Sequence, residues 1–444
     1  MYELSSNSIV LLIFAPQFLY LMLQLQTLRT QKDYVIDRLK VKNVADLSVV
    51  DSVLAIDEER RKIQTQYDEF LSKINTASKE IGKLMASGQH DEAEKMKTDV
   101  ALYKESSKLL GDQLASLEKQ QHDELVTLPN LPHSSVPLGK TPEENEIVRL
   151  GNEIPSLYEG AVPHWDLAKK YNLIDFELGN KITGAGFPVY INKGARLQRG
   201  LINYFLDFNT NAGYIEHQVP HMVNTDSAYA TGQLPDKEGQ MYHVTEDNFY
   251  MIPTAEVPVT NIYRDTIVKE NDLPIKLTAF SQCYRREAGS YGKDVRGLNR
   301  LHQFDKVEIV QFSLPSESYN VLEEMVLHVE KLIQSMNMPY RILRLCGGDM
   351  SFASALTYDF EVFSTAQQRW LEVSSVSNFE TFQTNRAKVR YKDENGKTQL
   401  VHSLNGSSLA LPRILACLLE NNQTADGIKI PSVLIPYTGF DLIN

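Results

Sequence analysis

The densest group of chemically capable side chains lies between Phe280 and Glu308. Two strand-like runs flank a turn-rich loop there, which predicts a β-hairpin. A guanidinium such as that of Arg285 can hold a phosphate group through two parallel hydrogen bonds. Glu287 stands two residues later, so on a strand it shares the face of Arg285, where a carboxylate can accept a hydrogen bond from the amino group of adenine. The segment is therefore a candidate nucleotide site, although a salt-bridged hairpin without a ligand has part of the same pattern.

The familiar nucleotide-binding loops are absent from the sequence, which contains neither GxxxxGK[ST] nor a GxGxxG loop after a strand. Its three cysteines, Cys283, Cys346 and Cys417, are far apart and form no CxxC pair. We therefore expect no structural zinc site, no disulfide framework and a reducing, cytoplasmic location. The formal net charge of -12 argues against general affinity for nucleic acids, but it does not exclude a local basic face.

A large sheet is expected to position this cluster. Strand-like runs at 187–191, 306–312 and 358–363 alternate along the chain with helix-like segments at 195–209 and 317–336. Strands and helices in mixed order are typical of α+β or α/β domains that are built around one sheet. At 444 residues, the chain is long enough for two or three domains.

Apolar residues in the N-terminal third follow two heptad seams. The first seam comprises Ile56, Ile63, Tyr67, Phe70, Ile74, Ala77, Ile81 and Leu84, and the second comprises Ala93, Met96, Val100, Tyr103, Ser107, Leu110, Leu114 and Leu117. Such spacings predict two helices, which residues 87–91 interrupt, with Asp91 as a candidate N-cap. The helices should form an antiparallel coiled-coil hairpin about 40 Å long. This rod is either a dimerisation element or an arm that reaches a partner.

Residues 1–21 are apolar, and three interpretations compete. A signal peptide needs a basic start and a small-residue cleavage site, which are missing, and a membrane span needs a longer run than one interrupted by Pro16 and Gln17. We favour a start assigned too early or a disordered extension, with no membrane segment. The expected organisation is then a helical arm at 22–127, a proline-rich linker at 128–140 and a large domain at 141–444.

The cluster at 280–308 resembles motif 2 of the class II aminoacyl-tRNA synthetases, in the form typical of the seryl-tRNA synthetase family. Gly213–Asn224 resembles motif 1, with Pro220 as its proline, and Leu404–Arg413 resembles motif 3. Met251–Pro258 resembles the serine-binding TAE segment. All four segments occur in the family's order.

This resemblance, which covers residues 22–444, implies an α+β fold: an antiparallel helical coiled-coil arm and a class II catalytic domain around a mainly antiparallel sheet. It implies that L-serine is activated with ATP to seryl-adenylate and transferred to tRNA(Ser), and also to tRNA(Sec), which shares the long variable arm. In this family, motif 1 builds a homodimer interface and the helical arm lies across the variable arm of the tRNA.

The site residues that the resemblance implies fall into three groups. The ATP group is Arg285, Arg286, Glu287, Phe304, Glu372, Val373, Ser374, Ser375 and Arg413, of which Arg285, Glu287 and Arg413 are the catalytic set. The serine group is Thr254, Ala255, Glu256, Arg285, Glu308 and Ser407. Glu372 and Ser375 are expected to hold Mg2+ together with the ATP phosphates, because hard cations prefer oxygen ligands.

The resemblance also assigns roles. Arg285 should contact the α-phosphate and the serine carboxylate. Glu287 should hold the adenine edge, and Phe304 should stack beneath the adenine ring. Arg413 should cover the other face of the ring or bind the γ-phosphate.

Two of these residues have simpler explanations. Glu308 pairs with Lys306 if both occupy one face of a strand. Ser407 is the N-cap of a helix that continues through Pro412 if the helix begins there. Neither explanation excludes a role in serine binding.

Three positions depart from the family pattern. Gly347 stands where threonine is usual, Leu356 where lysine is common, and Ser403 where threonine is common. Ser403 keeps the hydroxyl group, and none of the three belongs to the catalytic set.

Four other functions compete with this interpretation. A class II synthetase for another amino acid would lack this arm together with the TAE and HQFxKVE segments. An inactive, regulatory relative would have lost Arg285, Glu287 or Arg413, which are all present. A ligase acting on a carrier protein would lack the arm, and a structural coiled-coil protein would explain only residues 56–121.

Overall fold

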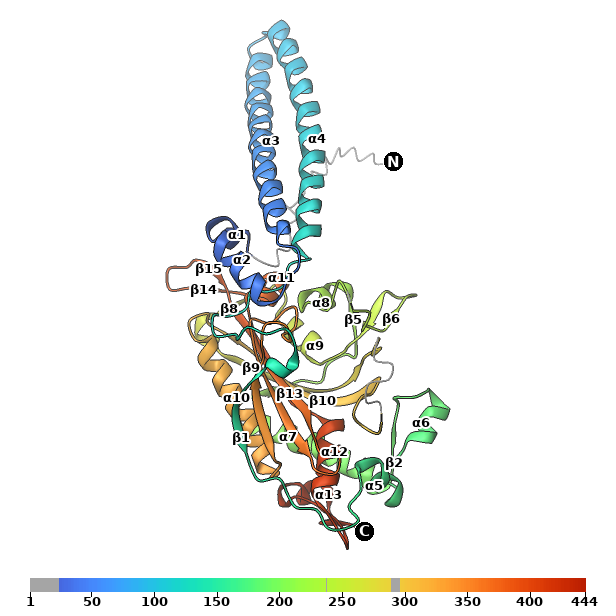
Figure 1. The fold of residues 1–444 in the computed structure, drawn as a ribbon. Helices are drawn as coiled ribbons and strands as arrows, with labels where there is room; N and C mark the ends of the chain where they lie inside the picture. Colours follow the sequence, from blue (N-terminus) through green and yellow to red (C-terminus); the bar gives the residue numbers. More distant parts are fainter. Residues whose placement is uncertain (1–23, 237, 289–295) are drawn as a thin grey trace, which may run out of the picture. The chain divides into compact units, whose positions relative to one another are not determined.

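The computed structural model describes residues 24–236, 238–288 and 296–444. The predicted N-terminal extension at 1–21 lies outside the described residues. Two compact units are present (Figure 1): Asp51–Thr127 forms the first, and the described residues before and after it form the second.

The first unit holds most of two long helices, α3 (Ser48–Ala86) and α4 (His90–Leu125). They are joined through Gly88, whose φ of 78° is a conformation that glycine adopts without steric cost. The prediction that Asp91 is an N-cap is wrong, because α4 already begins at His90 and Asp91 lies in its first turn. A carboxylate still suits that position, since it faces the positive end of the helix dipole.

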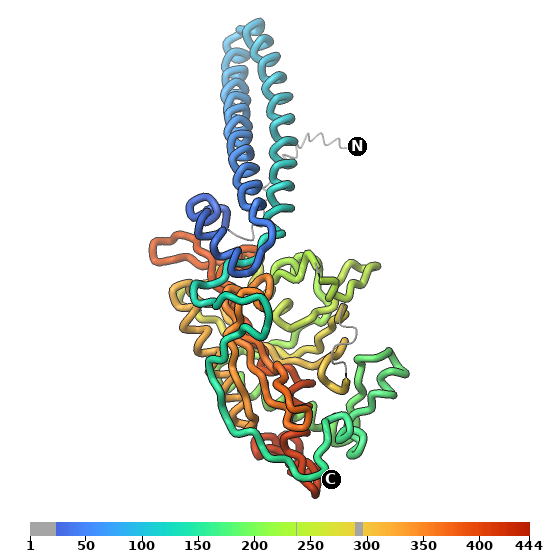
Figure 2. The backbone as a smooth tube through the Cα atoms, in the orientation of Figure 1, coloured from blue at the N-terminus to red at the C-terminus, as the bar shows by residue number. Residues whose placement is uncertain are grey.

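Contacts between α3 and α4 establish that they run in opposite directions. Near the base, the Ser52 hydroxyl donates a hydrogen bond of 2.8 Å to Glu124. Further along, the rings of Phe70 and Tyr103 lie with centroids 6.0 Å apart. The partner number falls as the first number rises, and Figure 2 shows the two helices side by side as one hairpin. The predicted antiparallel helical arm is confirmed.

The second unit is built on an eight-stranded sheet of described residues. In spatial order its strands are β1 (Glu146–Gly151), β11 (Tyr340–Arg344), β12 (Leu356–Ser364), β13 (Arg369–Glu380), β16 (His402–Ala410), β10 (Gln303–Ser313), β9 (Ile275–Tyr284) and β4 (Ile215–Glu216). All neighbours pair antiparallel except β4 and β9, which pair parallel. The predicted α+β class with a mainly antiparallel sheet is confirmed.

Helices and short strands surround this sheet. The other α-helices are α1 (Leu25–Thr30), α2 (Lys32–Val41), α5 (His164–Lys170), α6 (Phe176–Ile182), α7 (Asn192–Asn211), α8 (Thr225–Ala230), α9 (Glu256–Asn261), α10 (Ser318–Ser335), α11 (Phe382–Ala387), α12 (Leu411–Asn421) and α13 (Ile435–Thr438). The other strands are β2 (Ile174–Asp175), β3 (Val189–Tyr190), β5 (Met222–Asn224), β6 (His243–Val244), β7 (Phe249–Met251), β8 (Ile267–Lys269), β14 (Arg390–Lys392), β15 (Thr398–Leu400), β17 (Gln423–Thr424), β18 (Gly427–Lys429) and β19 (Leu442–Ile443). Within the part of the chain that the structure describes, no helix is both long and apolar enough to span a membrane.

Hydrophobic periodicity explains the central elements. On α10, buried residues recur three and four positions apart, so one stripe of the helix packs on β13 and β16. From Lys306 onward, β10 is buried on both faces, as a central strand should be. The predicted helices at 195–209 and 317–336 and the predicted strands at 306–312 and 358–363 are confirmed. The predicted strand at 187–191 is reduced to two residues outside the main sheet.

The end of α2 packs tightly against the rest of the second unit. The Lys42 ammonium donates to the carbonyl oxygens of Ser351 and Ser354, each at 2.8 Å. Close by, a Cβ atom at Gly347 would lie 1.9 Å from the carbonyl oxygen of Val41. Such a separation excludes any side chain, so the departure from the family pattern at this position has a steric reason.

We predict that Gly347→Thr lowers the free energy of unfolding of the second unit by about 1–3 kcal/mol, because α2 must move away. Urea unfolding followed by tryptophan fluorescence measures this unit alone, since Trp165 and Trp370 both belong to it. Glu394→Thr, at an exposed position of the same unit, is the control. An unchanged urea midpoint for Gly347→Thr would mean that α2 is not packed so closely.

Candidate active site

The hairpin predicted from the sequence is formed by β9 and β10. Gln303 pairs with Tyr284 at the end next to the loop, and Arg285 follows directly, with its N–H donating to the carbonyl of His302 at 2.9 Å. Glu287 is not on the strand, so the predicted alternation along a strand is wrong. Its φ of 51° is left-handed, which redirects the chain.

A cavity of about 170 Å³ opens beside this hairpin. Its lining residues come from the hairpin, from β13 and from the junction of β16 with α12: Arg285, Glu287, Leu298, Asn299, Arg300, Leu301, Phe304, Lys306, Glu372, Val373, Ser374, Ser375, Ser407, Ala410, Pro412 and Arg413. All predicted ATP residues except Arg286 lie in this wall. The Arg286 side chain is exposed outside it.

Cationic side chains occupy the cavity wall in defined positions. The Arg285 guanidinium lies 5.2 Å from the centroid of the Phe304 ring, a cation–π contact that orients both. Arg413 donates to the Asn299 carbonyl at 3.1 Å and to the Glu372 carbonyl at 2.9 Å. Arg413 therefore joins the last part of the hairpin loop to β13.

Glu287 also has a cationic partner. Its carboxylate accepts a hydrogen bond from Nε of Arg300, another residue of the cavity wall. Sequence reasoning missed Arg300 and its neighbours Leu298, Asn299 and Leu301, although they lie inside the motif 2 cluster.

Oxygen ligands gather around Glu372 and Ser375. Asp359 lies opposite Ser375 on the neighbouring strand, and its Oδ1 is buried without a hydrogen-bond partner in the described structure. Burial raises the pKa of Asp359 well above its usual range, and the Glu372 charge adds to this. Orphaned carboxylate oxygen fits a divalent cation, although no group of three or more His, Cys, Asp or Glu among the described residues forms a ready-made metal cage.

Three of the residues predicted to bind serine are buried and are not among those that line the cavity: Thr254, Glu256 and Glu308. Glu308 is only 2% exposed, and its Oε2 accepts hydrogen bonds from Lys306 at 2.7 Å and from the Thr254 hydroxyl at 3.0 Å. The simpler explanation of Glu308 is thus realised, since Lys306 is its partner. Ser407 lies directly opposite Glu308 on β16. The helix-cap explanation of Ser407 is wrong, because α12 begins four residues later, after Ala410.

Glu256 is a second buried carboxylate next to Glu308. It opens α9 directly after Thr254 and Ala255, and its Oε1 accepts a hydrogen bond of 2.5 Å from Gln383. Burial, and then the charge of Glu308, raise the pKa of Glu256 to about 7. Two carboxylates therefore share the electrostatic influence of the single ammonium of Lys306.

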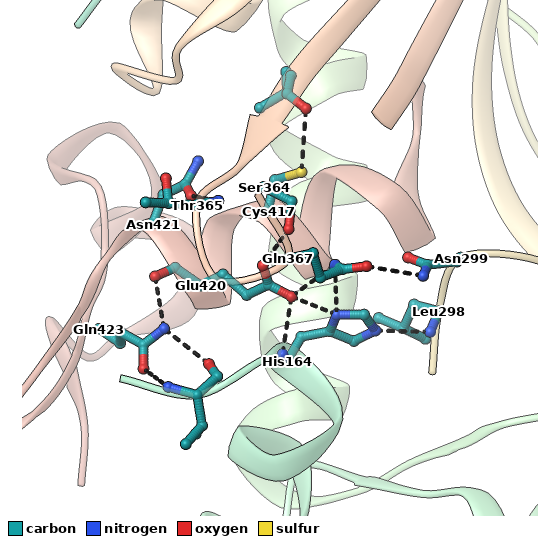
Figure 3. A network of polar contacts seen from close by, with 12 residues as sticks. His164, Leu298, Asn299, Ser364, Thr365, Gln367, Cys417, Glu420, Asn421 and Gln423 are labelled. Atoms are coloured by element: carbon teal, nitrogen blue, oxygen red, sulfur yellow. Dashed lines mark hydrogen bonds and ion pairs between the residues drawn. The ribbon is translucent and has the colours of Figure 1, made fainter. Parts of the chain in front are cut away.

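A buried network positions one side of the cavity (Figure 3). His164 Nδ1 lies 2.7 Å from Glu420, and the N–H of Leu298 donates to His164 Nε2 at 2.9 Å. Because Nε2 accepts, the ring proton is on Nδ1 and points to Glu420. Gln367 donates to Glu420 at 2.8 Å and accepts from Asn299 at 3.0 Å. Through these bonds α12 fixes the segment that accepts the Arg413 hydrogen bond.

The comparisons with known proteins agree with one another. Residues 22–132 match the Seryl-tRNA synthetase N-terminal domain, and residues 242–422 match the tRNA synthetase class II core domain (G, H, P, S and T). A serine–tRNA ligase of Salinibacter ruber is 49% identical, with 95% of this chain and 99% of that protein covered.

The chain belongs to the seryl-tRNA synthetase family. It is thereby an enzyme, a serine–tRNA ligase with a class II core. The crystal structure of seryl-tRNA synthetase from Pyrococcus horikoshii complexed with ATP has a TM-score of 0.87 at 30% identity, covering 95% of this chain and 99% of that one. The cytoplasmic serine–tRNA ligase from Naegleria fowleri in complex with AMP has a TM-score of 0.84 at 26% identity, with the same coverage.

We predict that Glu420→Gln weakens ATP binding about tenfold, which corresponds to about 1.4 kcal/mol. The amide cannot accept all the hydrogen bonds that the carboxylate accepts, so the segment at Leu298 and Asn299 loses its fixed position. Calorimetric titration with ATP measures the effect. The control is Glu394→Gln at an exposed position, and equal ATP affinities of the two variants would contradict this role of the network.

Proposed function

We propose that this chain activates L-serine with ATP to form seryl-adenylate and transfers serine to tRNA(Ser), and also to tRNA(Sec). The observation that carries the proposal is the continuity of one site. Arg285, Glu372 and Arg413 line the cavity at the hairpin, and Ser407 in the same wall is paired with the buried Glu308.

Two displacements make up the reaction. A serine carboxylate oxygen attacks the α-phosphorus of ATP, and pyrophosphate leaves. A hydroxyl of the terminal tRNA nucleotide then attacks the seryl carbonyl carbon, and AMP leaves. Neither step needs a covalent enzyme intermediate, so positioning and charge stabilisation dominate. Arg285 is suited to both steps, because one guanidinium can bind a carboxylate and a phosphate oxygen.

At the nucleotide end, Glu287 and Phe304 are assigned to the adenine and Arg413 to its other face or the γ-phosphate. Arg286 and the backbone of Val373 and Ser374 complete the assignment. Glu372 and Ser375 would hold Mg2+, with Asp359 adjacent. The cation, when bound, neutralises negative charge on the phosphate oxygens.

Charge balance supports serine as the substrate. Glu256 and Glu308 have only the Lys306 ammonium between them, so the pocket is one positive charge short once Arg285 is assigned to the substrate carboxylate. The α-ammonium of serine supplies that charge. Hydroxyl groups of Thr254 and Ser407 are partners for the serine side chain, and alanine is rejected because these buried groups lose a partner.

The helical arm is assigned to binding the tRNA variable arm, which is recognised by shape and backbone more than by base sequence.

A homodimer through motif 1 is supported by exposed apolar side chains there, Ile215 at 58% and Met222 at 50%. We place the enzyme in the cytoplasm.

We predict that Arg285→Ala and Glu308→Ala each reduce serine-dependent ATP–pyrophosphate exchange at least a hundredfold, because each removes a charge that the transition state or the substrate needs. Exchange is measured with each amino acid in turn, and serine alone should support it. Arg369→Ala, at an exposed position, is the control. Exchange with serine that survives both substitutions would refute the site assignment.

Deletion of residues 56–121 tests the arm. Ser52 and Glu124, which remain on either side of the deletion, are hydrogen-bonded at 2.8 Å, so a short turn can close the gap. We predict that adenylate formation persists while tRNA charging falls at least a hundredfold, because long-range positioning of the tRNA is lost. Equal loss of adenylate formation and tRNA charging would contradict the assignment of the arm to tRNA binding alone.

A further inference from the structure

Gln383 has a buried side-chain amide, and the proposed reaction assigns it no role. It lies on α11, is 1% exposed, and makes three hydrogen bonds. Its Nε2 donates to the Thr231 carbonyl at 3.2 Å and to Glu256 Oε1 at 2.5 Å. Its Oε1 accepts from the Ser403 hydroxyl at 2.8 Å.

The chemistry of these partners forces the orientation of the amide. The Thr231 carbonyl can only accept, so the group that faces it must be the NH2 group of Gln383. The same NH2 group then meets Glu256, which must accept in turn. Ser403, whose hydroxyl can donate, is the only one of the three partners that suits the remaining amide oxygen.

The hydrogen bond from Gln383 helps to fix the Glu256 carboxylate. The N–H of Glu256 donates to the Thr254 hydroxyl at 3.2 Å, and Thr254 donates to Glu308. The Glu256 carboxylate is hydrogen-bonded by the side chains of Gln383 and Asn405, so its rotation is restricted. On the next turn of α11, Arg386 donates to the Tyr229 carbonyl at 2.9 Å, which ties the same helix to the end of α8.

We propose that Gln383, supported by Ser403, is a positioning residue of the serine pocket, which holds the Glu256 carboxylate in place for the bound amino acid. The inference rests on the proposed function and extends it to α11, which contributes nothing to the cavity wall. It also gives the hydroxyl at position 403 a purpose, since either serine or threonine can donate to the amide.

The test uses Gln383→Leu in the full chain, with ATP–pyrophosphate exchange at varied serine and varied ATP. Loss of a hydrogen bond to a charged group should lower kcat/KM for serine by about tenfold to a hundredfold. The KM for ATP should stay within about twofold, because the ATP assignment does not involve Glu256. Gln399→Leu on β15 is the matched control.

A pH profile separates positioning from mere structural support. The Gln383 hydrogen bond lowers the pKa of Glu256, so its removal raises that pKa further. If ionised Glu256 binds the ammonium of serine, the acid limb of kcat/KM moves to higher pH, by about one unit for one such bond. A residue that only stabilises the fold would leave the limb in place.

Substitutions at Ser403 keep the inference testable if Gln383→Leu does not fold. Ser403→Ala removes the donor that orients the amide and should lower kcat/KM for serine about threefold to tenfold. Ser403→Thr keeps the hydroxyl donor and should retain most of the kcat/KM for serine.

Unchanged serine kinetics in both Gln383→Leu and Ser403→Ala would overturn the inference, as would an equal rise in the two KM values. Absence of serine-dependent exchange in the unmodified chain would overturn the proposed function and this inference together.

Discussion

Two carboxylates that are almost completely removed from water impose the main constraint on this molecule. Glu308 is 2% exposed and Glu256 is 7% exposed, and burial without compensation would drive both to the neutral form. Lys306 supplies one compensating charge, and hydrogen bonds from Thr254 and Gln383 offset burial only in part, since the pKa of Glu256 is still raised to about 7. A site of this kind is stable only when every donor is correctly placed, so the surrounding sheet and helices must be rigid.

The antiparallel sheet provides that rigidity. Neighbouring strands β9, β10 and β16 place Ala279, Glu308 and Ser407 in one row, so Glu308 and Ser407, which we assign to serine binding, meet at fixed spacing although they are distant in the chain. Behind the row, α12 fixes the cavity wall through Glu420 and His164, which are both fully buried. In the proposed site, the serine end is therefore supported by α11 and the nucleotide end by α12.

Sequence reasoning could find groups that are close together along the chain, and it failed where folding brings distant groups together. Arg285 and Phe304 belong to one contiguous cluster, so their shared cavity was predictable. Gln383 and Glu256 are 127 residues apart, and His164 and Glu420 are 256 apart, so neither pair leaves a local pattern. The left-handed conformation of Glu287 is equally hidden, because nothing in its neighbourhood requires a glycine-like φ.

The arm, finally, is a module whose length is free to vary. Because α3 and α4 pair antiparallel and both ends meet at the base near Ser52 and Glu124, adding or removing one heptad in each helix together preserves the seam. Each such matched change alters the rod by about 10 Å and leaves the attachment points untouched. The length of the arm can therefore change, by evolution or by design, without any change in the residues of the candidate active site.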